Sequence, residues 1–80
     1  MNVVYMLEGA SGRHYIGSTS NLPQRLDAHH RGNTSTTKRL GHPLTLVAFR
    51  EFESMDEARR VERMLKAWKN PAKALDYLKM

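Results

Sequence analysis

The 80-residue chain has no cysteine, only three prolines and a single tryptophan. Without cysteine it can form neither disulfide bonds nor thiolate metal sites, so the sequence does not report a redox compartment. No apolar run approaches the roughly 20 residues that a membrane-spanning helix requires. The N-terminal stretch MNVVYMLEGA also lacks the basic start and long apolar segment of a secretion signal. These absences predict no membrane span and a cytoplasmic location.

The length and the 40% hydrophobic content predict one small domain over residues 1–80. This size is close to the lower limit at which a core is stable without disulfides or metals. No linker, internal repeat or low-complexity segment divides the chain. A core of this size leaves no room for a deep substrate cavity.

Positive charge is concentrated in the first 50 residues. This part carries six Lys/Arg residues and all four histidines against two acidic residues, whereas residues 51–80 carry seven basic and six acidic residues. The formal net charge is +5. An electropositive segment suits an anionic partner such as nucleic acid. Charge alone does not establish such a partner, because many small proteins are basic for solubility.

Two strand-like runs, residues 3–7 and HYIGS at residues 14–18, predict a β-hairpin around the turn signal GASG. Tyr5 and Tyr15 stand ten residues apart in these runs. Because alternate residues of a strand point to one face, both tyrosines can share a face if the register permits. Their default role is that of sheet residues with hydroxyl groups at the edge of the core.

The segment NLPQRLDAHHRG predicts a helix capped by Asn21 and stopped at Gly32. Residues four apart should form its apolar side and an adjacent polar face: Leu22, Leu26 and His30 on the first, Arg25 and His29 on the second. An arginine and a histidine one turn apart are commonly just a solvated helix face.

Residues 33–42 (NTSTTKRLGH) are polar and predict a loop. Lys38, Arg39 and His42 are its candidates for contacts with a nucleic-acid backbone. An ordinary solvent-exposed loop explains the composition almost as well.

A third strand, LTLVAFREF, is expected after Pro43. Ser54 and Glu57 form a capping box that begins a second helix, and Asn70 followed by Pro71 begins a third. The order ββαβαα predicts an α+β fold, with a small three-stranded antiparallel sheet flanked by three helices.

Glu62 is the most unusual polar residue of the second helix. It borders the apolar face, and it lies beyond the first turn, where the helix dipole favours acidic side chains. The simplest explanation is a surface ion pair with Arg59 or with Lys66, four residues ahead.

Taken together and in order, these features resemble the GIY-YIG nuclease family over essentially the whole chain. The likeness rests on a strand tyrosine, then Tyr-Ile-Gly-Ser, then Arg-Leu-x-x-His on a capped helix, and then Glu-Ala-x-x-x-Glu on a later helix. The stretch STSNLPQRLDAHHRG is similar to that of small stand-alone members. The first half of the name motif departs from the pattern: Tyr5 is kept in Val-Tyr-Met, but neither glycine nor isoleucine flanks it.

The resemblance implies a divalent-metal-dependent DNA endonuclease that uses Mg²⁺ or Mn²⁺. Its implied catalytic residues are Tyr5, Tyr15, Arg25, His29 and Glu62, with Glu62 as the metal ligand. One carboxylate can suffice, because magnesium keeps several waters and also binds phosphate oxygens. Arg25 is suited to clamp the scissile phosphate.

The resemblance also implies that one tyrosine helps to deprotonate the attacking water while the other orients it, and it leaves open which does which. Beside Arg25 and a metal ion, a phenol pKa is expected to fall from its usual 10 towards useful basicity. Gly17 would let the backbone or the substrate come close. Many members carry an asparagine well after the glutamate, but Asn70 comes early for it and suits a helix cap better.

Two alternatives of other classes stay open. One is a catalytically inactive nucleic-acid-binding module of the same fold, and the other is an interaction domain for an acidic protein. Low sequence specificity is expected, on single-stranded, branched or duplex DNA, or with targeting by a protein partner. The biological roles open to such an enzyme include DNA repair.

Overall fold

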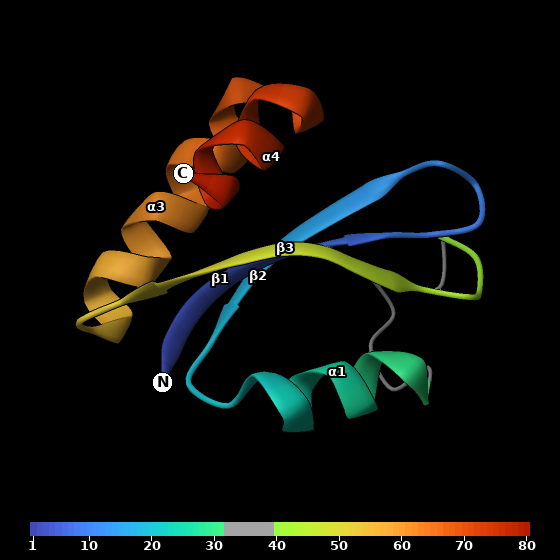
Figure 1. Ribbon diagram of the computed structural model, residues 1–80, viewed down its shortest axis with the longest axis horizontal. Helices are drawn as coiled ribbons and strands as arrows, with labels where there is room; N and C mark the ends of the chain where they lie inside the picture. The colour runs from blue at the N-terminus through green and yellow to red at the C-terminus, as the bar shows by residue number, and fades with distance from the viewer. Residues whose placement is uncertain (32–39) are drawn as a thin grey trace.

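A computed structural model describes residues 1–31 and 40–80 of the chain (Figure 1). Its elements, in chain order, are β1 (Asn2–Glu8), β2 (His14–Thr19), α1 (Leu22–His30), β3 (Thr45–Phe52), α3 (Met55–Trp68) and α4 (Pro71–Lys79). The predicted α+β fold is confirmed: the three strands form one antiparallel sheet, and the element order is ββαβαα. None of the helices in the described ranges is both long and apolar enough to span a membrane.

The strand order is β2-β1-β3, so β1 is central and β2 forms one edge of the sheet. Residues 3–7 of β1 are all buried, as expected for a central strand covered on both faces. In the β1–β2 pairing, Tyr5 lies opposite Gly17 and Leu7 lies opposite Tyr15. This register places the two tyrosines on the same face of the sheet, because residues directly opposite each other point the same way.

Each face of the sheet has its own hydrophobic core. On one face Val3, Tyr5 and Leu7 pack with residues that include Leu22 of α1, and Tyr15 and Leu26 lie against this cluster. On the other face Val4 and Met6 pack with Ala58 and Leu65 of α3 and with residues of α4. Figure 1 shows the same division, with α1 below the sheet and α3 and α4 above it.

The predicted helix caps are confirmed. The side chains of Asn21, Ser54 and Asn70 accept hydrogen bonds from backbone N–H groups at the starts of α1, α3 and α4. α1 ends at His30 with Arg31 as its C-cap. Gly32, at which the sequence predicted the helix to stop, lies outside the described residues.

The prediction that His30 lies on the apolar side of α1 was wrong. His29 is buried, with 1% of its surface exposed, whereas His30 is exposed. His29 lies seven residues after the buried Leu22, which is two helical turns, and faces the sheet with it.

Candidate active site

A cluster of three rings lies between the hairpin and α1. The Tyr5 and Tyr15 ring centroids are 6.1 Å apart, and the His29 ring lies 5.8 Å from Tyr5 and 5.2 Å from Tyr15. A 2.7 Å hydrogen bond joins Tyr5 Oη to His29 Nε2. Tyr5 and His29 are each 1% exposed, while Tyr15 is partly exposed. The structure therefore brings together three of the residues that the sequence singled out.

Burial raises the pKa of the Tyr5 phenol well above its ordinary value. The neighbouring Tyr15 and the carboxylate of Glu62 raise this pKa further, and the charge of Arg25 opposes them. The expected fall of the Tyr5 pKa is therefore wrong for the protein alone. Tyr5 is held as a neutral phenol that makes a hydrogen bond.

Gly17 provides the space that the two tyrosine rings occupy. A Cβ atom at this position would lie 2.6 Å from Tyr5 Oη and 2.9 Å from Tyr15 Cε2. Because real side chains do not approach so closely, residue 17 of β2 must be glycine for Tyr5 to reach across to the edge of the sheet. The close approach that the sequence predicted at Gly17 is therefore made by the tyrosine rings of the protein itself.

We expect Gly17→Ala to displace both rings and to lower the free energy of unfolding by roughly 1–3 kcal/mol, the usual range for overpacking. Urea unfolding gives the stability, and the ring-proton NMR shifts of Tyr5 and Tyr15 report the displacement. Gly12→Ala is the control, because its Cβ meets nothing within 4 Å, although its φ of +86° strains an alanine. The control should lose stability with unchanged tyrosine shifts. Unchanged tyrosine shifts in Gly17→Ala would contradict the assignment.

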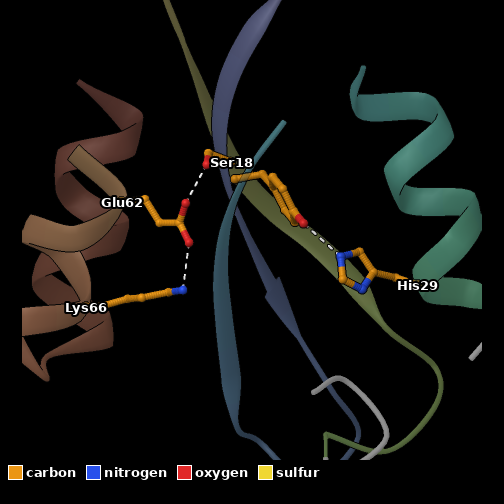
Figure 2. A network of polar contacts seen from close by, with 5 residues as sticks. Ser18, His29, Glu62 and Lys66 are labelled. Carbon is orange, nitrogen blue, oxygen red and sulfur yellow. Dashed lines mark hydrogen bonds and ion pairs between the residues drawn. The ribbon is translucent and has the colours of Figure 1, made fainter. Parts of the chain in front are cut away.

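Glu62 of α3 approaches β2 from the opposite face. Its Oε1 accepts a hydrogen bond from Ser18 Oγ, and its Oε2 accepts one from Lys66 Nζ at 2.6 Å. The side chain of Glu62 is only 19% exposed. Figure 2 shows Glu62 and Lys66 on one side of β2 and His29 on the other, with Ser18 between them. The ion pair expected from helical spacing is thus present, but the carboxylate also bonds to the sheet.

The carboxylate and the ring cluster meet at the edge strand β2. Tyr5 reaches over Gly17, and Glu62 bonds to the next residue, Ser18. The Lys66 ammonium lies 5.7 Å from the centre of the Tyr15 ring. The carboxylate of Glu62 is also among the charges that raise the pKa of Tyr5. Acid and phenols therefore border one short stretch of β2.

Arg25 stands one turn before His29 on α1, and its side chain is exposed. Its positive charge favours the ionised form of Tyr5, and it acts with burial, the larger cause, to lower the pKa of His29. Arg25 lines a cavity of about 310 Å³ at the junction of β2 and α1, together with Thr19 and Gln24. Its charge thus reaches the ring cluster while its side chain borders open space.

Of the remaining candidate residues, the structure describes His42 and Asn70. Lys38 and Arg39 lie outside the described residues. His42 is exposed and follows Gly41, whose carbonyl oxygen accepts a hydrogen bond from Ala10 N at the hairpin turn. That turn is at the far end of the hairpin from Gly17 and Ser18. Asn70 acts as the N-cap of α4, as the sequence suggested.

The sequence did not identify Ser18 or Lys66 as residues of the site. Strand alternation carries a signal for Ser18, since it must point to the face opposite Tyr15 and Gly17. The signal is incomplete, because only the packing of α3 on that face shows that Glu62 is its partner.

His29 should make stability depend on pH. Burial, helped by the positive charge of Arg25, lowers its pKa in the folded state. The folded protein then binds fewer protons than the unfolded chain below about pH 6.5, the ordinary histidine value. The stability contributed by neutral His29 is therefore complete above that pH and is lost as the pH falls.

Urea unfolding between about pH 7.5 and pH 5 checks this expectation. The wild type should lose more stability on acidification than His29→Gln, which has no ionisable group at this position. Equal losses in the two proteins would contradict it.

The residues around Glu62 could supply only part of the coordination shell of a magnesium-type ion. No group of three or more His, Cys, Asp or Glu side chains gathers within residues 1–31 and 40–80. Magnesium is commonly bound by one or two carboxylates, substrate phosphates and several waters. The partly exposed carboxylate of Glu62, beside the Ser18 hydroxyl, is compatible with a site of this kind.

Comparison with known proteins gives concordant matches. The model of the GIY-YIG catalytic domain matches residues 1–75. A UPF0213 protein from Streptococcus pneumoniae is 36% identical over 70 residues, which are 88% of this chain and 71% of that protein. A UPF0213 protein from Nitratidesulfovibrio vulgaris is 40% identical over 63 residues, which are 79% of this chain and 57% of that protein.

A solved structure agrees with these matches. The solution NMR structure of the UPF0213 protein BH0048 from Bacillus halodurans has a TM-score of 0.52 and 35% sequence identity. The alignment covers 82% of this chain and 70% of that one.

Proposed function

Because this chain belongs to the GIY-YIG family, a family of nuclease type, we propose that it is a divalent-metal-dependent endonuclease that hydrolyses phosphodiester bonds of DNA. The observation that carries the proposal is the convergence at β2. Two phenols, a histidine and a partly buried carboxylate lie around the adjacent residues Gly17 and Ser18. Low sequence specificity and action on single-stranded or branched DNA belong to the same proposal.

Glu62 is the proposed metal ligand. A bound Mg²⁺ or Mn²⁺ supplies positive charge to the phosphoryl oxygens and to the leaving alkoxide. Ser18 donates a hydrogen bond to one carboxylate oxygen of Glu62, which leaves the second oxygen as the proposed donor to the cation. Lys66 holds that second oxygen in the protein alone, so a bound cation would compete with Lys66 for it.

Tyr15 is the phenol better placed to accept a proton from water. It is partly exposed at the edge of the sheet, where water can reach it, and the Lys66 ammonium lies 5.7 Å from the centre of its ring. Tyr5 stays protonated because it is buried, and its hydrogen bond to His29 fixes its hydroxyl group. We assign Tyr15 the role of the base and Tyr5 that of the residue that orients the water.

Arg25 is proposed to bind the scissile phosphate. Its guanidinium can donate two hydrogen bonds to the non-bridging oxygens, and its exposed position on α1 borders the cavity beside β2. Positive charge at this position stabilises the charge that develops as water attacks phosphorus.

The test compares single-stranded, duplex and flapped oligonucleotides with Mg²⁺, with Mn²⁺ and with a chelator. We expect internal cleavage that needs the metal. Binding without cleavage under every condition would instead support the inactive nucleic-acid-binding module, and binding to none of these oligonucleotides would remove both functions.

The two tyrosines should differ in this assay. Tyr15→Phe removes the proposed base and should lower turnover by about 10²–10⁴-fold, the usual contribution of acid–base catalysis. Tyr5→Phe should lower turnover less, and it should also lower the free energy of unfolding by about 1 kcal/mol through the lost hydrogen bond with His29. Initial rates and urea unfolding of both variants decide the matter. A larger loss of turnover in Tyr5→Phe would reverse the two roles.

A further inference from the structure

A second recess lies beside the proposed active site, between β2 and the junction of α3 with α4. It has a volume of about 320 Å³, and Ile16 and Leu65 form apolar parts of its lining. Lys66 also lines it, and the same side chain bonds to Glu62. The recess therefore shares Lys66 with the carboxylate that is proposed to bind the metal.

Tyr15 and two lysines give the recess an aromatic wall and a positive rim. The lining residues include Tyr15, Lys66 and Lys69 and no acidic side chain. Lys66 and His14, another lining residue, are paired with Glu62 and Glu8, respectively. Among the ion pairs of the described residues, none involves Lys69. Its charge is thus uncompensated at this rim.

Lys69 also has an unusual backbone. It is the C-cap of α3 with φ 52° and ψ 36°, the left-handed conformation that glycine adopts without strain. A lysine in this conformation is less favourable than glycine for the fold. The side chain of Lys69 borders the recess.

We propose that this recess binds one unpaired nucleotide adjacent to the scissile phosphate, with the base against the Tyr15 ring and a phosphate on Lys69. The inference rests on the proposed nuclease function and specifies its substrate as single-stranded nucleic acid. An aromatic ring beside positive charge is the combination by which proteins bind single strands, because every base can stack and every nucleotide carries a phosphate.

The size of the recess favours an unpaired nucleotide over a duplex. A volume of about 320 Å³ is at the lower end of the range of small-molecule sites. A base inside a duplex is stacked and paired, and it must be extruded before it can enter such a recess.

The test measures binding of a fluorescent oligothymidine of about 12 nucleotides in chelator, between about 50 and 200 mM salt. Lys69→Gly removes the charge and relieves the backbone strain. It should weaken binding about fivefold and reduce the slope of log K against log salt by about 0.7, the value for one contact with a single strand. Its thermal midpoint should stay or rise, so loss of folding does not explain the weaker binding. Lys69→Arg keeps the charge and should bind as the wild type does.

Lys79→Gln is the matched control, because it removes one lysine charge at the end of α4 and away from this recess. Its affinity and salt slope should equal those of the wild type. Tyr15→Phe keeps an aromatic ring and should retain binding, whereas Tyr15→Ala should weaken it.

Wild-type affinity of Lys69→Gly for oligothymidine would overturn the inference, as would an equal loss for a duplex of the same length. Since no metal is present, the result is independent of cleavage. Binding that depends on Lys69 without any cleavage by the wild type would keep the recess and remove the endonuclease assignment. Cleavage by the wild type, together with binding that does not depend on Lys69, would keep the endonuclease assignment and remove the recess as a nucleotide site.

Discussion

Glu62→Gln should reduce metal-dependent cleavage roughly a hundred- to a thousandfold, the range seen when one electrostatic group of a reaction centre is removed. The neutral amide is a much weaker ligand for a hard cation than a carboxylate. The proposed shell has a single carboxylate, and among the described residues no group of three or more His, Cys, Asp or Glu side chains offers an alternative cation site.

The same substitution should leave the fold intact. The amide oxygen of glutamine can still accept the hydrogen bond from Ser18, and its volume is nearly that of glutamate. The loss is the ion pair with Lys66, whose own side chain is 50% exposed, and helical pairs of this spacing contribute only about 0.3–0.5 kcal/mol.

Three measurements on Glu62→Gln check this account: initial cleavage rates, urea unfolding, and Mn²⁺ affinity by electron paramagnetic resonance. Glu51→Gln is the control, since it removes one exposed carboxylate from β3. We expect wild-type rates and metal affinity in the control. Undiminished cleavage by Glu62→Gln would remove this residue from the mechanism, whatever its metal affinity.

Local sequence signals were sufficient for most of the fold. Asn21, Ser54 and Asn70 each cap a helix as predicted, because capping is a contact between residues two or three positions apart. The hairpin was predictable for the same reason, and its observed register places both tyrosines on one face.

The candidate site was only partly predictable, because its contacts join distant parts of the chain. The Ser18–Glu62 hydrogen bond spans 44 residues, and the Tyr5–His29 bond spans 24. Periodicity cannot decide between His29 and His30 as the buried histidine, since they follow the apolar Leu26 by three and four residues, and both spacings are close to one helical turn. Packing of α1 against β1 decides it.

The expected direction of the Tyr5 pKa was wrong for a related reason. Charges near a phenol can be proposed from a motif, but burial depends on the completed fold. For Tyr5 burial is the largest cause and outweighs the favourable charge of Arg25. That result, absent from the sequence, is the reason for proposing Tyr15 rather than Tyr5 as the base.

Arg25→Ala should lower turnover by about 10²–10³-fold with a smaller change in KM, because charge on the phosphate grows in the transition state. Arg25→Lys should recover only part of the rate, since an ammonium cannot form the paired hydrogen bonds of a guanidinium. Both variants should stay folded, because the side chain of Arg25 is exposed on α1. Single-turnover and steady-state kinetics on the best oligonucleotide separate the chemical step from binding.

Arg31→Ala is the matched control for this prediction. Arg31 is the C-cap of the same helix, and its guanidinium pairs with Asp27 at 3.0 Å, so its removal also takes one positive charge from this end of the fold. An equal loss of turnover in Arg31→Ala and Arg25→Ala would indicate a general attraction of DNA to the basic surface. A loss confined to Arg25→Ala, expressed in turnover, is the result expected if the guanidinium contacts the reacting phosphate beside β2.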